Sequence, residues 1–519
     1  MTGLQNEDNF GLKEHKRVLL IMTLVSISTF QYGLDFGIIG GLQAMVGFLK
    51  VFGEPAPDTP IGYNLNAERQ QLISSLMTLG AFISSSTAGF TAIWIGRRWS
   101  LWIACILAFA STALMQATTS IAGLYAGRFI NGLSNGLLMT HSQLYIHEVS
   151  PAKYRALAIS GFLYWTSIGT LVGTVIDNFT QRIQDKNAYI ISLGIIHIVP
   201  LILSIGLVFI PESPRWLLAT GSEAKAERAL VRIRPRGWDT TTEFNQIRDA
   251  LEAEKRIHAD VGILDLFRNP IDRRRTLLSI ASVTSQAASG SMFIIAYGTY
   301  FFAMANIGDP FGNSCIAIAC GVVAVILNSC ITTRWGYRRV CLITGLIVCG
   351  ICQLIIASVY QTAPGTKRTG QVIIAFTIIY IVSYNGFIAT YAWVGGGEFP
   401  SQRLRSYTFG ISTSIGFLGA WVTTFTAPYF INPDELNWGP RYGFIWAPIC
   451  VFTAVVIYFF YPETKDRTLE EIDELFEARL PARKFRGYRT TRTAEIESEK
   501  MSGDEKGPQV VEEHIETKV

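Results

Sequence analysis

Two short stretches decide the fold: EVSPAKYR, from Glu148 to Arg155, and EFPSQRLR, from Glu398 to Arg405. Each stretch closes a long apolar run, begins with an acid, continues through a proline and ends with an arginine. The copies lie about 250 residues apart, and a repeat of this kind is typical of duplicated helical bundles. We therefore predict two similar helical halves, each with a charged latch between its helix ends.

The composition indicates that these halves lie in a membrane. Of 519 residues only 16% are charged, and the mean hydropathy is +0.30, whereas soluble proteins carry about 25% charged residues. Apolar runs of about 20 residues, each long enough to cross a bilayer, explain the deficit. We count twelve: 18–41, 72–94, 100–119, 121–147, 158–179, 189–210, 277–302, 314–333, 340–360, 371–396, 407–431 and 443–461. The predicted fold is an all-α membrane protein, with 12 transmembrane helices in two pseudo-symmetric six-helix bundles and a cytoplasmic helical connector.

The same runs set the domain boundaries. The predicted parts are an N-terminal tail (1–17), an N-terminal six-helix bundle (18–216), a helical loop (217–276), a C-terminal six-helix bundle (277–466), and a helix with a disordered tail (467–519). Within the loop, EAKAERALVRIR and EFNQIRDALEAEKRIHADV have the periodicity of amphipathic helices with charged outer faces.

Basic residues gather in short loops that follow the second, fourth, eighth and tenth spans: Arg97 and Arg98, Lys153 and Arg155, Arg334, Arg338 and Arg339, and Arg403 and Arg405. The positive-inside rule places these loops and both termini in the cytoplasm. The net charge is only +4 and is spread over loops, which argues against nucleic-acid binding. We expect a monomeric, multi-pass protein of the plasma membrane.

The cysteines give no sign of chemistry. Six of the eight lie inside spans: Cys105, Cys315, Cys320, Cys330, Cys341 and Cys450. Cys349 and Cys352 form a CxxC inside an apolar helix, where packing explains them better than redox or metal chemistry. We expect no metal and no cofactor. Because no nucleophile–base or metal-ligand spacing occurs outside the membrane, the sequence does not predict an enzyme.

An acid and an arginine stand deep in two apolar runs. Asp35 lies in the first span, where Gly33, Gly37 and Gly41 form a stripe that allows close helix contact. A carboxylate at that depth costs about 2.5–3.5 kcal/mol, so it must find a partner, face a cavity or be protonated. Arg128 in the fourth span is its natural partner, because a buried guanidinium needs an anion or water. The alternative is a packed, protonated acid.

The fourth span carries two further features. Gly132 and Gly136 form a GxxxG contact face. His141 lies seven residues before Glu148 on the same face, and we interpret it as a packed polar residue rather than a proton relay.

Polar groups interrupt the seventh and tenth spans. The seventh, SQAASGSMFIIAYGTYFF, is an apolar helix broken by glycine, and the tenth places a triple glycine at 395–397 just before Glu398, where the helix is expected to bend. Polar groups at this depth need a helix interface or a wet cavity. The candidates for such a cavity are Gln286, Ser289, Tyr297, Asn385 and Trp393. For Trp393, a lipid-facing or core position is the alternative.

These motifs resemble the sugar porter family of the major facilitator superfamily, in its fungal branch. PESPRW at 211–216, PETK at 462–465 and the two Glu-to-Arg latches carry the resemblance, which extends from about residue 18 to 486. It implies two bundles that rock around a central site, with Asp35 and Arg128 as the proton-coupling pair and Gln286, Tyr297 and Trp393 in the sugar site. It also implies an inner-gate charge network, formed by Arg97, Arg98, Glu148, Arg155, Glu212, Arg338, Arg339, Glu398, Arg405 and Glu463. For Arg97 and Arg98, simple anchoring at the membrane surface is the alternative.

The chain also departs from the family pattern. The acid that opens the DRxGRR turn is replaced by Ile93 and Thr333, and the fifth-helix glutamine by Leu163. In the seventh helix, Ala287 and Met292 stand where the family has a glutamine and an asparagine. Each missing amide removes a hydrogen bond of about 0.5–1.5 kcal/mol to a hydroxylated solute. The identity of the solute is therefore left open.

Three functions follow. The first is a proton-coupled importer of a sugar, either a hexose or an oligosaccharide, or of a related polyol. The second keeps the transporter but changes its solute to an organic acid, a quinate-like ring or a secondary metabolite. The third is a sugar sensor that binds solute without moving it; the moderate length of the tail and the presence of Asp35 and Arg128 argue against it.

Overall fold

The computed structural model describes residues 14–258, 264–304, 308–465, 467 and 469–488. Within these residues, the side chains of 152–160, 253–258, 331–335, 402, 406 and 470 are outside the description.

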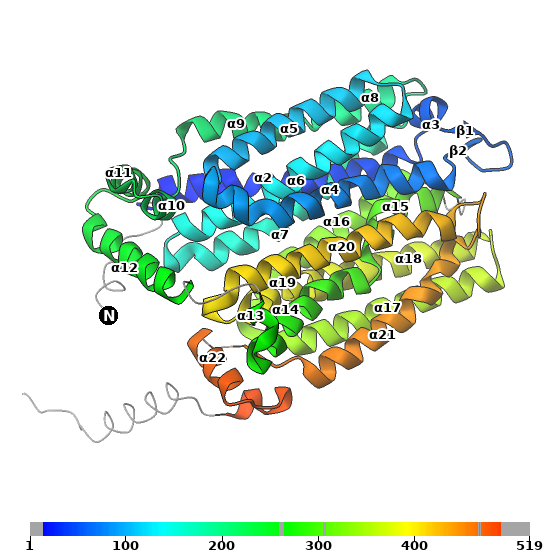
Figure 1. Ribbon diagram of the computed structural model, residues 1–519. Helices are drawn as coiled ribbons and strands as arrows, with labels where there is room; N and C mark the ends of the chain where they lie inside the picture. Colours follow the sequence, from blue (N-terminus) through cyan, green and yellow to red (C-terminus); the bar gives the residue numbers. More distant parts are fainter. Residues whose placement is uncertain (1–13, 259–263, 305–307, 466, 468, 489–519) are drawn as a thin grey trace, which may run out of the picture.

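The N-terminal half is a bundle of six membrane-length segments (upper half of Figure 1, blue to green). The segments are α2 (Lys16–Leu42), α4 (Ala67–Trp94), α5 (Arg97–Ala117), α6 (Ile121–Val149), α7 (Ala152–Thr180), and the pair α8 (Asn187–Ile195) and α9 (Ile198–Phe209). The predicted spans are therefore confirmed in number and order, although the sixth is interrupted between α8 and α9.

The C-terminal half repeats this arrangement (lower half of Figure 1, green to orange). Its segments are α14 (Pro270–Ala288) with α15 (Ser291–Met304), α16 (Pro310–Trp335), α17 (Arg338–Thr362), α18 (Lys367–Ser383) with η1 (Tyr384–Ala389) and α19 (Thr390–Glu398), α20 (Arg405–Ile431), and α21 (Gly443–Phe460). The predicted all-α fold with two six-helix bundles is confirmed.

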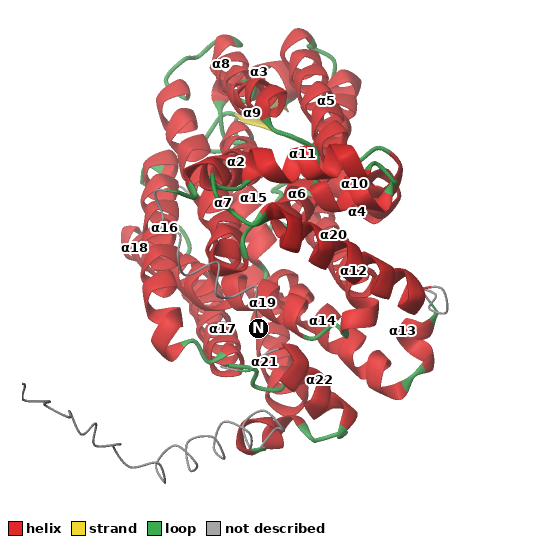
Figure 2. Cartoon of the chain, turned by 90° about the vertical axis from the view of Figure 1, so that its left-hand side faces the viewer, coloured by secondary structure: helices red, strands yellow, loops and turns green. Residues whose placement is uncertain are grey.

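The short elements define the two ends of the molecule. The end that we call the connector end carries α10 (Pro214–Ala219), α11 (Glu223–Ile233), α12 (Thr240–His258), α13 (Asp265–Arg268), η2 (Gln402–Leu404), α22 (Leu469–Glu477) and η4 (Ala482–Gly487). Figure 2 looks at the molecule from this end. The opposite, hairpin end carries α3 (Val46–Phe52), β1 (Glu54–Pro55) paired antiparallel with β2 (Tyr63–Asn64), and η3 (Gly439–Tyr442).

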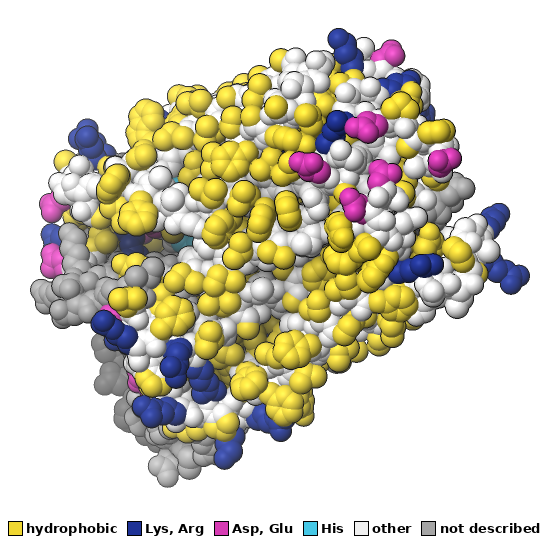
Figure 3. All heavy atoms as spheres, turned by 45° about the vertical axis from the view of Figure 1, so that its right-hand side comes forward, with side chains coloured by type: hydrophobic (Ala, Val, Ile, Leu, Met, Phe, Trp, Pro, Cys, Tyr) yellow, Lys and Arg dark blue, Asp and Glu magenta, His cyan; other side chains and the backbone are white. Residues whose placement is uncertain are grey.

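The surface between the two ends is apolar. Across the described residues, nine helical segments are long and apolar enough to cross a membrane; α6, α7 and α20 complete the twelve spans. Figure 3 shows an apolar band across the middle of the molecule, with Lys, Arg, Asp and Glu near its ends. An apolar band between charged ends is the surface expected of a protein that spans a bilayer.

Glycines set how closely the helices of the first bundle approach. A Cβ atom added at Gly33 would lie 2.0 Å from the carbonyl oxygen of Thr166 in α7, and one at Gly37 would lie 2.4 Å from that of Thr170. At Gly132 the added atom would lie 2.2 Å from the carbonyl oxygen of Met77 in α4. Both predicted glycine contact faces are therefore confirmed, and they join α2 to α7 and α6 to α4.

The seventh and tenth spans are irregular in different ways. The seventh breaks at Gly290, whose φ of +77° favours glycine, as predicted. In the tenth, α19 continues regularly through residues 395–397 to Glu398, and the irregular turn is the π-helix Tyr384–Ala389. The expected bend at the triple glycine is wrong, because the flexibility of glycine permits a bend but does not impose one.

Candidate functional site

Asp35 and Arg128 form a buried ion pair in the middle of the first bundle. Nη1 of Arg128 lies 2.8 Å from Oδ1 and 2.9 Å from Oδ2 of Asp35, and each side chain is only 1% exposed. Nε of Arg128 donates to the carbonyl oxygen of Ile73 at 2.9 Å, and Asn131 donates to Oδ1 of Asp35 at 2.7 Å. The carboxylate thus has three donor contacts, from two side chains of α6.

The guanidinium of Arg128 depends on this pairing. A buried guanidinium stays charged, so it needs an anion or a polar partner nearby. Nη2 of Arg128 is buried and has no hydrogen-bond partner. The guanidinium is therefore incompletely satisfied even in the paired state.

His141, farther along α6, is fully buried. Its ring nitrogens lie 3.1 Å from Oγ1 of Thr91 and 3.1 Å from the carbonyl oxygen of Leu137. These local contacts support the interpretation of His141 as a packed polar residue.

A charge network joins three helix ends of the first bundle. Nη2 of Arg97 lies 2.7 Å from Oε1 of Glu148 at the end of α6, and Ser213 donates to Oε2 of Glu148 at 2.5 Å. The carboxylate of Glu212 accepts the backbone N–H groups of Arg97 and Arg98 at 3.1 Å. Because these N–H groups begin α5, the carboxylate occupies the position that a helix N-terminus favours for an anion.

The second bundle repeats the network. Nη2 of Arg338 lies 3.0 Å from Oε1 of Glu398, and Thr464 donates to Oε2 of Glu398 at 2.5 Å. Glu463 accepts the N–H groups of Arg338 and Arg339, at 3.0 and 3.2 Å, where α17 begins.

The second arginine of each turn binds carbonyl oxygens instead of carboxylates. Nε of Arg98 donates to the carbonyl oxygen of Leu207 at 2.9 Å, near the end of α9, and Arg339 donates to that of Tyr458 near the end of α21. Their backbones belong to the charge networks, whereas their side chains cap the ends of neighbouring helices. Such an arrangement satisfies carbonyl groups that a helix end leaves unpaired.

The remaining predicted network residues are less informative. Arg405 begins α20 and is partly buried. The side chain of Arg155 lies outside the described residues, as does that of Thr333. Ile93, which stands in place of the acid, is 66% exposed, and its carbonyl oxygen accepts the indole N–H of Trp216 at 3.0 Å.

The residues predicted to bind solute are not gathered in one hollow. Trp393 lines a hollow between the bundles, together with Ser85, Met139, Thr140 and Gln143 from the first bundle and Phe409, Gly410, Thr413 and Phe417 from the second. Asn385 lies elsewhere, against Gly321 of α16. Gln286 accepts a hydrogen bond from Tyr384 at 3.2 Å.

Ser289 and Tyr297 are fully buried and take part in hydrogen bonds between helices. The hydroxyl of Tyr297 donates to the carbonyl oxygen of Thr424 in α20 at 2.6 Å. Ser289 lies at the break before α15, where its carbonyl oxygen accepts from Gln353 at 2.7 Å and from Tyr380 at 2.9 Å. In this conformation neither hydroxyl faces the hollow lined by Trp393.

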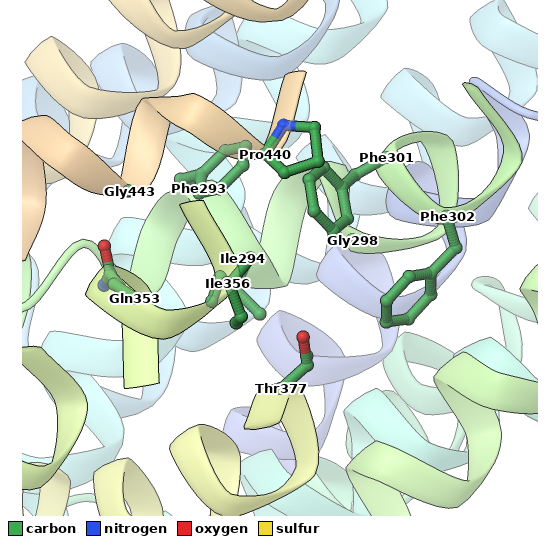
Figure 4. A pocket seen from close by; sticks show the side chains of 10 residues that line it. All are labelled: Phe293, Ile294, Gly298, Phe301, Phe302, Gln353, Ile356, Thr377, Pro440 and Gly443. Carbon is green, nitrogen blue, oxygen red and sulfur yellow. The ribbon is translucent and has the colours of Figure 1, made fainter. Parts of the chain in front are cut away.

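A second, mostly apolar pocket lies behind that break, inside the second bundle (Figure 4). Gln353 and Thr377 are the polar side chains on its wall, and Figure 4 shows them among apolar groups that include Ile294 and Ile356. Because the pocket lies within one bundle, it is separate from the space between the two halves.

Comparison with known proteins identifies the family. The model for sugar (and other) transporters matches residues 21–476. The chain belongs to the sugar porter family of the major facilitator superfamily. It is 27% identical over 473 residues to the major facilitator-type transporter ecdD of Aspergillus rugulosus, a match that covers 88% of this chain and 87% of that protein. It is 26% identical to the high glucose sensor RGT2 of Saccharomyces cerevisiae, covering 90% of this chain and 61% of the sensor.

Solved structures show the same fold. A partially occluded, inward open form of the xylose transporter XylE from E. coli has a TM-score of 0.71 with this sugar porter, at 18% identity, and covers 87% of this chain and 100% of that one. The same transporter bound to 6-bromo-6-deoxy-D-glucose has a TM-score of 0.69 at 20% identity, covering 89% and 99%.

Several residues at these sites of the sugar porter were not predicted from its sequence. Ser213 directly follows Glu212, and Thr464 directly follows Glu463. The repeat of PES and PET therefore places a hydroxyl at the same position in both halves, and this repeat is the signal that could have predicted both residues. Asn131 lies three residues after Arg128, which places it on the same helix face. No local sequence pattern marks the polar residues of the hollow, Thr140, Gln143 and Thr413, because only the packing of the two halves brings them together.

Proposed function

We propose that this sugar porter is a proton-coupled importer of a sugar or related polyol, which works by alternating access. The observation that carries the proposal is the buried pair of Asp35 and Arg128, since an ion pair in a membrane is costly and is typical of a functional site. The basic loops between spans favour a cytoplasmic connector end in the plasma membrane. The solute then passes between the two bundles.

The bundles touch at the hairpin end in this conformation, which supports an inward-facing state. Asn432 donates to Gln70 at 3.1 Å and to the carbonyl oxygen of Leu65 at 2.7 Å, and it accepts from Asn64 at 3.0 Å. Tyr300 donates to Asn64 at 3.0 Å. These bonds join the two halves and must break before the solute can enter from the hairpin side.

In the proposed cycle Asp35 binds a proton from outside, and its attraction to Arg128 falls. The bundles then close over the solute and open at the connector end, where the proton leaves and the ion pair forms again. One charge that moves through about 100 mV releases about 2.3 kcal/mol, which corresponds to about fiftyfold accumulation.

Uptake into vesicles tests the proposal. The purified protein is reconstituted and given an inward proton gradient, with glucose, xylose and a disaccharide as separate solutes. The wild type should concentrate at least one of them, and a protonophore should abolish accumulation. The variant Asp35→Asn should carry the same solute only down its gradient, whereas uphill accumulation by Asp35→Asn would contradict the proposal.

A solute with fewer hydroxyl groups is the second candidate. Leu163 packs against the apolar core of the second bundle, and Met292 against the cluster that contains Phe293 and Tyr297, so these positions give no amide to a sugar. If excess sugars leave uptake of quinate or another organic acid unchanged, this candidate replaces the sugar. If the protein binds glucose but carries no solute in vesicles, it is a sensor.

A further inference from the structure

A second carboxylate, Asp177, is buried in the membrane part of the first bundle. It lies near the end of α7, and the residue is 0% exposed. Neither Oδ1 nor Oδ2 has a hydrogen-bond partner, and no cation of the described residues forms an ion pair with it. It therefore differs from Asp35, which has a guanidinium and an amide.

Close packing holds this carboxyl group in place. A Cβ atom added at Gly41 of α2 would lie 2.1 Å from Oδ2 of Asp177, so the carboxyl group fills the space over that glycine. The hydroxyl of Ser192, which lies 2.9 Å from that of Thr180, is also near the carboxyl group. A carboxylate without a counter-charge in such a place is strongly disfavoured, and the group takes up a proton instead.

The site adjoins the surface at which the two bundles meet. One turn before Asp177, the carbonyl oxygen of Thr174 accepts from Sγ of Cys315 in α16, at 3.3 Å. On α2, a Cβ atom added at Gly40 would lie 3.1 Å from the carbonyl oxygen of Ile295 in α15. Both contacts join the two bundles, and parting of the bundles at the hairpin end would break them.

The groups that face Asp177 leave it without a compensating charge. The nearby groups on three helices are uncharged: Gly41 on α2, Thr180 on α7 and Ser192 on α8. From α16 the facing titratable group is Cys315, with Asp309 near the start of that helix. Neither of these two is a cation.

We propose that Asp177 is a second proton-binding site, which must be protonated for the bundles to close at the hairpin end. When that end opens, water reaches the carboxyl group and the O–H bond releases its proton to water. When it closes, the same carboxylate takes a proton from the same side. The proton returns to where it came from, so Asp177 makes closure depend on the outer pH without adding to the protons carried per solute. The inference rests on the alternating access of the proposed function.

Distance measurements across the hairpin end test the proposal. Spin labels are placed at positions 187 and 367, which are exposed on different bundles, in protein without native cysteines reconstituted in lipid. Without solute, the ratio of closed to open molecules should fall by up to tenfold per pH unit as the pH rises, because one proton is linked to closure. Asp177→Asn should stay closed over the whole range, since its amide remains neutral.

Matched variants decide between the possible causes. Asp185→Asn changes an exposed acid at the same end and should keep the wild-type pH dependence. The measurement uses no solute and no proton gradient, so a failure of the coupling proposal, which is read from uptake into vesicles, is separable from a failure of this one. Asp177→Ser, which does not crowd Gly41, serves if the asparagine variant does not fold. An unchanged pH dependence in both Asp177 variants would overturn the proposal.

Discussion

The two bundles match at their connector ends and differ at their centres. At the ends, an arginine, two glutamates and a hydroxyl make equivalent contacts: Arg97, Glu148, Glu212 and Ser213 in one half, and Arg338, Glu398, Glu463 and Thr464 in the other. At the centres, the first bundle holds the ion pair of Asp35 and Arg128, whereas the second holds neutral hydrogen bonds around the break at Gly290.

The difference indicates a division of work after duplication. In the proposed cycle both halves open and close at the same end, and both have the same charge network there. A charge that responds to a proton would be needed in only one half, because one buried ion pair would couple the movement to a gradient. The other half then has a broken helix and neutral contacts at its centre.

Breaking the ion pair of the first bundle should have the largest effect. Arg128→Met leaves Asp35 buried beside only Asn131, and removal of one partner from a buried pair costs about 3–5 kcal/mol. The double variant Asp35→Asn with Arg128→Met should recover most of that loss, because no charge remains buried. Thermal unfolding in detergent measures both. A double variant that is as unstable as the single one would mean that packing of the arginine, rather than its charge, matters.

A change at the centre of the second bundle should cost less. Gln353→Met removes the hydrogen bond to the carbonyl oxygen of Ser289, a neutral contact, and we expect a loss of about 1 kcal/mol. Oε1 of Gln353 has no partner, so its removal relieves an unsatisfied group and keeps the cost low. If the same unfolding assay gave a cost as large as that of Arg128→Met, the asymmetry of the centres would be refuted.

The sequence predicted the features that have a strong local signal better than those that depend on tertiary packing. Repeated acids, glycine stripes and the lone Asp35 and Arg128 follow from spacing and from the cost of charge in lipid, and the structure brings that pair together. The sequence could not place the π-helix at Tyr384–Ala389, because the triple glycine was the stronger local signal. It also overlooked Asp177, since DNFTQR reads as the polar edge of a span and only tertiary packing buries the acid.

The latches provide a test of equivalence. Glu148→Gln and Glu398→Gln each replace a charged hydrogen bond to an arginine, worth about 1.5–3 kcal/mol, by a weaker one. Because the contacts correspond, each variant should lower the free energy of unfolding by a similar amount. Thermal unfolding in detergent measures the change. A large change in one variant and none in the other would show that the two latches contribute differently to stability despite their matching contacts.

The smallest effect concerns Glu212, which lies between α9 and α10. Burial raises the pKa of its carboxyl group, although the N–H groups of Ser213, Arg98 and Arg97 oppose that shift. A raised pKa in the folded protein means that the folded state holds this proton more tightly than the unfolded state does. The stabilisation is therefore present below the usual glutamate pKa and is lost as the pH rises through the raised value. Glu212→Gln should remove this part of the pH dependence of thermal unfolding, while the exposed control Glu227→Gln should not. An identical pH profile in wild type and Glu212→Gln would mean that the helix N-terminus offsets the cost of burying the charge, and the first latch would then need no proton at any point of the cycle.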